Sequence, residues 1–135
     1  MNNKLEIQRL IDIFYKIISG KVGEERDWNH FKSLFLENAH LMSMKFNNYN
    51  ECISRPLDVD SYIIGLNKFL ETSDFYEYAL NYEIKVFRDI AHVYSQYEAK
   101  TSLKDCKPTK EGVNLVHLAK VEGKWKIISM LWQDK

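Results

Sequence analysis

Residues 75–87 read FYEYALNYEIKVF and decide the fold class. Apolar and polar side chains alternate here with a period of two, which is typical of a β-strand that buries one face. The predicted face carries Tyr78, Leu80, Tyr82, Ile84 and Val86, and Arg88-Asp89 is a turn signal. Before residue 75 the helical period dominates, so the change of period divides the sequence into two parts.

The sequence after this turn predicts three more strands. They cover residues 90–100, 113–121 and 125–132, and Glu122-Gly123-Lys124 is the turn between the last two. Residues 101–112 form a polar, lysine-rich connection, which is long enough to act as a flap over one end of the sheet. Consecutive strands joined in this way predict a mainly antiparallel sheet.

The sequence before residue 75 predicts three amphipathic helices. The first covers residues 4–19 and begins with a capping box formed by Asn3 and Glu6. The second and third begin after Asp27 and Asp58, both of which are favourable N-cap residues. Between these two helices, residues 39–46 alternate as a strand and an asparagine-rich loop follows before Arg55-Pro56. We therefore predict an α+β fold and one domain, residues 1–135.

Composition excludes several classes of function. The 19 basic residues balance the 19 acidic ones, so no overall field favours nucleic acid or an anionic membrane. No apolar run is long enough for a transmembrane helix, and no segment resembles a signal peptide. The two cysteines are too few for a disulfide framework. We expect a cytoplasmic protein.

The sequence resembles a known superfamily over nearly its whole length. The stretches that carry the resemblance are LFLENAHL (34–41), RPLDVDSYI (55–63), IAHVYSQYE (90–98), GVNLVHL (112–118), GKWKIIS (123–129) and WQD (132–134). They are similar to the NTF2-like superfamily, which includes SnoaL-like and ketosteroid-isomerase-like proteins, and in particular to a largely uncharacterised bacterial branch. Most of these motifs describe how a sheet closes and packs, so they indicate a fold and not a reaction.

The resemblance implies a cystatin-like cone, with three N-terminal helices packed on a curved sheet and a pocket between them. It also implies a homodimer through the sheet, and the terminal strands are apolar on both faces, as such a contact requires. The ketosteroid isomerase branch uses an Asp as base in the strand after the second helix. Ser43 falls near that position here, and a serine cannot replace that base unaided. This departure argues against steroid isomerase chemistry.

Two residues are candidates for catalysis. Glu77 begins a strand rich in tyrosine, and a carboxylate among aromatic rings has the raised pKa that acid/base chemistry requires. The alternative is a solvated carboxylate at the strand end. His117 shares its predicted face with Val113 and Leu115, which predicts burial as an acid/base group, a ligand contact or an ordinary core histidine.

Six further residues are candidates for ligand contacts: Tyr62, Tyr78, Tyr82, Ser95, Tyr97 and Asn114. Ser95 and Tyr97 share a strand face with small apolar residues, as the lining of a concave sheet should, and the opposite face from His92 to Glu98 is expected to form the dimer contact. The four histidines are scattered without metal-ligand spacing, so we predict no metal and no cofactor.

Three functions remain open. The first is binding of a small apolar molecule in the pocket. The second is a cofactor-free lyase, isomerase or cyclase of the SnoaL or ketosteroid isomerase type. The third is a dimeric assembly module. The first is favoured because no constellation for proton transfer is evident in the sequence.

Overall fold

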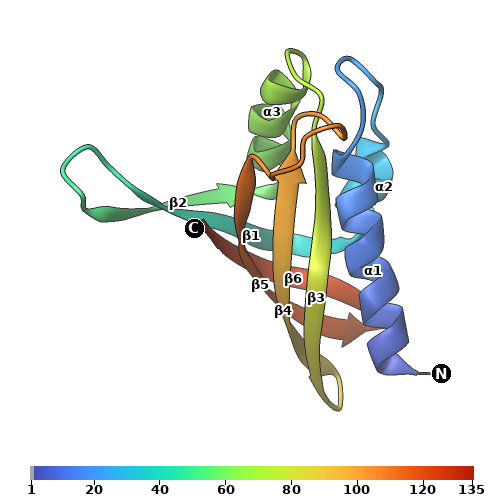
Figure 1. The fold of residues 1–135 in the computed structure, drawn as a ribbon. Coiled ribbons are helices and arrows are strands. Elements are labelled where there is room, and N and C mark those ends of the chain that lie inside the picture. Colours follow the sequence, from blue (N-terminus) through green and yellow to red (C-terminus); the bar gives the residue numbers. More distant parts are fainter. Residues whose placement is uncertain (1) are drawn as a thin grey trace.

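The computed structural model describes residues 2–135, which form three helices and six strands (Figure 1). In chain order these are α1 (Asn3–Ile18), α2 (Trp28–Ser33), β1 (Phe35–Phe46), β2 (Cys52–Asp58), α3 (Val59–Leu70), β3 (Tyr76–Phe87), β4 (Ile90–Lys100), β5 (Lys110–Val121) and β6 (Lys124–Asp134). The strands make one sheet in the order β2-β1-β6-β5-β4-β3. Only the β1–β6 pair is parallel, and the predicted α+β class is confirmed.

The helix starts follow the predicted capping with one correction. Asp27 accepts a hydrogen bond from the His30 amide at 3.0 Å, and Asp58 accepts one from the Ser61 amide at 2.7 Å. Helix α1 is capped by Asn2, which accepts from the Leu5 amide, and not by Asn3. The Asn3 side chain instead accepts a hydrogen bond from the indole of Trp125 on β6, so it ties the helix to the sheet.

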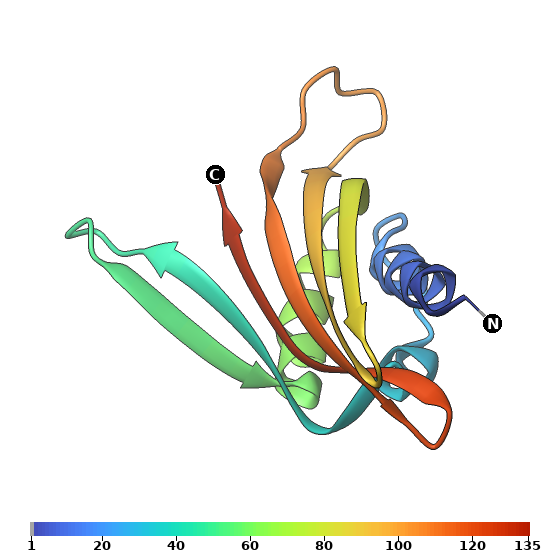
Figure 2. The same ribbon diagram turned by 90° about the horizontal axis from the view of Figure 1, so that it is seen from below.

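Strand β2 was not predicted, since the sequence between the predicted strand 39–46 and the third helix was interpreted as a loop. Residues 52–58 pair antiparallel with β1, so a long hairpin separates α2 from α3. The strand lacks the usual signals because it lies at the sheet edge, where almost every side chain is exposed. Pro56 is tolerated there, since an edge strand has one row of amides that needs no partner. Figure 2 shows the hairpin extending as an arm from the body of the molecule.

A β-bulge in β3 changes which side chains share a face. Ala79 pairs with Tyr97 and Asn81 pairs with Gln96, so Leu80 is left without a partner opposite it. The predicted face of β3 is therefore wrong at its first half: Glu77 lies on the same face as Tyr82, and Tyr78 lies on the other face. Bulges of this kind bend a strand and redirect its side chains.

The core lies between the helices and one face of the sheet, here called the inner face. Helix α1 contributes Ile7, Ile11, Phe14 and Ile18, which are almost fully buried. On the sheet they meet Val93, Val116, Leu118 and Ile127. Each such side chain stabilises the fold by about 1.5–3 kcal/mol. Helix α1 packs beside β3 at one side of the sheet and α3 lies near β1 and β2 at the other, which leaves a space between them.

Candidate functional site

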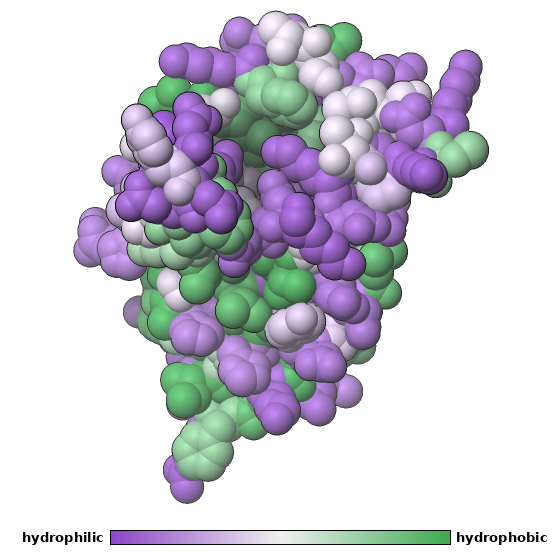
Figure 3. All heavy atoms as spheres, turned by 60° about the vertical axis from the view of Figure 1, so that its left-hand side comes forward, coloured by the Kyte–Doolittle hydropathy of each residue, from purple (hydrophilic) through white to green (hydrophobic). Residues whose placement is uncertain are grey.

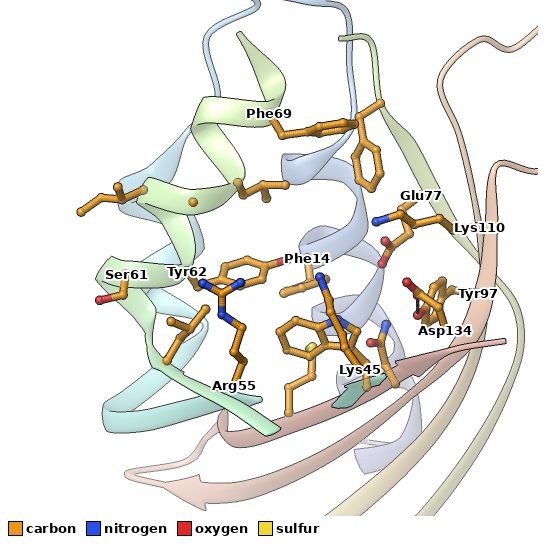
Figure 4. Close-up of a pocket in the computed structure, with 18 residues that line it drawn as sticks. Phe14, Lys45, Arg55, Ser61, Tyr62, Phe69, Glu77, Tyr97, Lys110 and Asp134 are labelled. Carbon is orange, nitrogen blue, oxygen red and sulfur yellow. Dashed lines mark hydrogen bonds between the residues drawn. The ribbon is translucent and has the colours of Figure 1, made fainter. Parts of the chain in front are cut away.

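A cavity of about 510 Å³ occupies this space between α3 and the inner face of the sheet (Figure 4). Its apolar wall comes mainly from Phe14, Leu57, Leu66, Phe69, Phe75, Met130 and Trp132. Its polar groups are Ser61, Tyr62, Glu77, Tyr97, Asn114 and Asp134, with the cations Lys45, Arg55 and Lys110. Figure 3 shows a hollow on the face beside the β1–β2 arm, with a hydrophobic floor and a largely hydrophilic border.

Glu77 is held in the cavity through the end of helix α1. The Ser19 hydroxyl accepts a hydrogen bond from the Glu77 amide at 3.0 Å and donates to the Tyr15 carbonyl at 2.8 Å. Burial raises the pKa of the Glu77 carboxyl from 4.5 to about 7; the Asn114 amide and Lys110 oppose this rise, and the charge of Asp134 adds to it. Glu77 can therefore both hold and release a proton near neutral pH.

Behind the cavity, a buried hydrogen-bonded cluster fixes Asn114. The Tyr15 hydroxyl lies 2.7 Å from the Ser95 hydroxyl and accepts a hydrogen bond from the Asn114 amide at 2.9 Å. Ser95 and Asn114 are opposite each other on β4 and β5. Burial raises the pKa of Tyr15 to about 12, so the phenol stays protonated and can bridge the two strands. The cluster orients the one amide that acts on Glu77.

Tyr97 and Asp134 form a second pair at the cavity wall. The Tyr97 hydroxyl donates to the Asp134 carboxylate, and burial together with this carboxylate raises the pKa of Tyr97 well above its usual value. Gly112 lies opposite both residues in the sheet. A Cβ atom there would overlap the Tyr97 hydroxyl and the Gln133 carbonyl, so glycine is what allows the tyrosine to cross β5.

Tyr62 forms part of the aromatic side of the cavity. Its ring stacks on Phe31 at 5.8 Å between centroids and meets the edge of Trp132 at the same distance. Burial raises its pKa well above the usual tyrosine value, so its hydroxyl is neutral at physiological pH. In the part of the chain that the structure describes, no hydrogen bond joins this hydroxyl to another protein group.

Solved structures resemble this architecture over almost its full length. A protein of unknown function with a cystatin-like fold from Nostoc punctiforme is 17% identical with a TM-score of 0.74, covering 98% of this chain and 91% of its own. An NTF2-like protein with a cystatin-like fold from Novosphingobium aromaticivorans is 10% identical with a TM-score of 0.75, covering 98% and 81%. An NTF2-like protein from Cytophaga hutchinsonii is 14% identical with a TM-score of 0.72, covering both chains completely.

The chain has the NTF2-like, cystatin-like fold. The resemblance read from the sequence is thereby confirmed for the fold. No family model matches the sequence, and no curated protein matches it. At these identities the likeness describes the fold alone, so any function has to be inferred from the side chains in the cavity.

In this NTF2-like fold, four of the predicted site residues line the cavity: Tyr62, Glu77, Tyr97 and Asn114. Ser95 is fully buried behind Asn114 and supports it. Tyr82 lies on the inner face but reaches Asp12 on helix α1, outside the cavity. Ser43 is also buried on the inner face of β1, opposite Trp132 and Arg55.

Two predicted residues lie on the opposite, outer face of the sheet. Tyr78 donates a hydrogen bond to Glu98 at 2.7 Å, because the bulge at Leu80 reverses its orientation. His117 is exposed and its ring stacks against His92 at 6.4 Å, so the prediction of burial is wrong. The apolar neighbours used for that prediction, Val113 and Leu115, belong to a face that the single chain leaves uncovered.

Sequence reasoning missed the three cations of the cavity. Lys45 follows Leu41 and Ser43 at intervals of two, and both of these face the core. Lys110 precedes Gly112 and Asn114 in the same way on β5. The alternation places both lysines on the inner face, but a lysine near a strand end is usually a solvated residue and was not considered for the site.

Within residues 2–135, no group of three His, Cys, Asp or Glu side chains is placed to hold a metal ion. The described helices are all too short or too polar to cross a membrane.

Proposed function

We propose that this NTF2-like protein binds a small, mainly apolar molecule in the cavity, with Glu77 as its principal hydrogen-bonding partner. The observation that carries the proposal is the cavity itself. Its volume of about 510 Å³ lies within the usual range of about 300–1,000 Å³ for small-molecule sites. A largely apolar wall with a few convergent polar groups is the usual composition of such sites.

Glu77 supplies orientation within this wall. With a pKa of about 7, its carboxyl group can donate a hydrogen bond to a carbonyl or accept one from a hydroxyl. The hydroxyl of Tyr62 offers a second contact from the opposite side, since α3 carries Tyr62 and β3 carries Glu77. A ligand with one polar group therefore has a defined direction in the cavity.

Binding can be tested with N-phenyl-1-naphthylamine, a neutral apolar dye whose fluorescence rises in an apolar environment. We expect one dye per chain to bind, and Leu66→Trp to weaken binding because the larger indole would occupy part of the cavity. Ile53→Trp places the same indole on the exposed arm and should leave binding unchanged. Undiminished binding in Leu66→Trp would place the dye outside the cavity and refute the proposal.

A second function, proton transfer without a cofactor, is favoured by one observation, the position of the Glu77 carboxyl in a largely apolar cavity, where burial raises its pKa. A carboxylate in an apolar cavity is a stronger base than one in water. The probe 5-nitrobenzisoxazole tests this directly: the base removes the proton at C3, the N–O bond breaks, and a coloured cyanophenolate forms. We expect a rate that rises through about pH 7 and disappears in Glu77→Gln. Equal rates in both proteins would rule out a catalytic base at Glu77.

We also propose that the outer face of the sheet forms a homodimer. Tyr94, Leu115 and Leu131 lie in one row across β4, β5 and β6, and they are 41%, 43% and 37% exposed. An exposed apolar row of this kind in the middle of a sheet supports a contact between copies of the chain. Such a dimer is compatible with the third function, an assembly module. It also leaves the cavity open to a ligand, since the cavity lies on the opposite face of the sheet.

A further inference from the structure

Three cations of the cavity form no ion pair within residues 2–135. Lys45, Arg55 and Lys110 all line it, and no ion pair or hydrogen bond joins their side chains to another protein group within residues 2–135. Figure 4 shows their charged ends turned toward the space between α3 and the strands. A purely apolar ligand would make no use of these three positive charges.

The carboxylates of this region offset only part of this positive charge. Asp60 on α3 pairs with Lys32 at 2.9 Å, and Glu111 beside Lys110 pairs with Lys135 at 3.7 Å. Asp134 accepts the hydrogen bond of Tyr97. The remaining acid, Glu77, is neutral in about half of the molecules at pH 7, since its pKa is about 7. The cavity thus carries more positive than negative charge.

The three cations line the cavity from two sides. Arg55 on β2 lies opposite Ser43 on β1, and Lys45 follows Ser43 by two residues, so both side chains leave the same face of the arm. Lys110 comes from the start of β5 on the other side. An anion in the cavity is attracted by all three charges.

We infer that the ligand is an amphipathic organic carboxylate, with its carboxylate among Lys45, Arg55 and Lys110 and its apolar body on the aromatic wall. The inference rests on the proposed binding function and names the class of ligand. The guanidinium of Arg55 matches a carboxylate with two parallel hydrogen bonds, and Lys45 on the same arm and Lys110 on the other side of the cavity add charge. Trp132 and Phe69 provide the apolar surface for the rest of the molecule.

The test compares naphthalene-2-carboxylate with naphthalene-2-carboxamide by isothermal titration calorimetry at pH 7.5. The two probes share their ring system and differ in charge. We expect the carboxylate to bind at least about tenfold more tightly than the carboxamide, and Arg55→Gln or Lys45→Gln to weaken the carboxylate alone by about threefold to tenfold. Lys104→Gln, in the exposed loop before β5, changes the net charge equally and should have no effect. Added salt should weaken only the carboxylate.

The outcomes separate this inference from the proposed function. Equal affinities for both probes, with no effect of the two substitutions, would overturn the carboxylate assignment while the binding function stands. Binding of neither probe, together with failure of the neutral dye, would overturn the binding function and the assignment with it. All three cations are exposed, so the variants should fold, and the thermal unfolding midpoint of each variant verifies that.

Discussion

Replacing Glu77 with Gln should change how the stability of the protein depends on pH. In the folded state the carboxyl has a pKa of about 7, against 4.5 for the ordinary group. The folded protein therefore holds this proton more tightly than the unfolded chain does. The contribution of this bound proton to the free energy of unfolding is fully present below about pH 4.5 and is lost as the pH rises through about 7.

The size of the effect follows from the two pKa values. Their difference corresponds to about 3 kcal/mol in the free energy of unfolding, and to about 2 kcal/mol where the carboxyl remains partly hydrated at the cavity. Glu77→Gln has no proton to lose, so it keeps the stabilisation at high pH. The free energy of unfolding of the variant minus that of the wild type should rise by about 2–3 kcal/mol between pH 4.5 and pH 8.

Urea unfolding followed by tryptophan fluorescence at several pH values measures this difference. Glu83→Gln is the matched control, since it makes the same change of net charge on an exposed position of the same strand, and its pH profile is subtracted. A difference that stays flat with pH, or falls, would show that the carboxyl is not desolvated. The reading of Glu77 as an acid or base near neutral pH would then fail.

Three further predictions concern the fold and its assembly. Gly112→Ala should lower stability by about 1–3 kcal/mol, because the new methyl group displaces the Tyr97 ring; unchanged thermal unfolding would refute the close approach. Asp58→Ala should lower the unfolding midpoint by about 4 °C in differential scanning calorimetry, since α3 loses its cap; an unchanged midpoint would contradict this role. Light scattering should give twice 16.1 kDa for the wild type and 16.1 kDa for Leu131→Glu; a wild-type monomer would exclude the dimer.

The sequence predicted those parts of the fold that local chemistry determines. The caps at Asp27 and Asp58 and the turns at Arg88 and Gly123 are short-range features, and each holds in the structure. Strand β2 was missed because its order comes from pairing with β1 at the sheet edge, which leaves no period in its side chains. Long-range pairing is what a single sequence reveals least.

Part of the lining of the cavity could be predicted from the sequence. Glu77, Tyr97 and Asn114 were identified because polar groups in tyrosine-rich or apolar strands stand out. His117 was assigned to the wrong environment, because β5 is apolar on both faces and alternation cannot tell a core from an uncovered surface. Lys45 and Arg55 were missed because the pairing of β1 with β2, which places Arg55 opposite Ser43, was itself missed.

The unpaired Leu80 in β3 has a consequence for comparing proteins of this fold. The ladder with β4 absorbs that residue as a bulge, so the pairs on either side keep the same faces that a strand one residue shorter would have. Removing Leu80 should restore a regular ladder and leave Glu77 in the cavity. An alignment with a strand that lacks the bulge, made without a gap, places Tyr78 where the carboxylate belongs. A protein of this fold without the bulge should therefore be aligned by strand pairing, with Leu80 as a one-residue insertion, before its acids are compared.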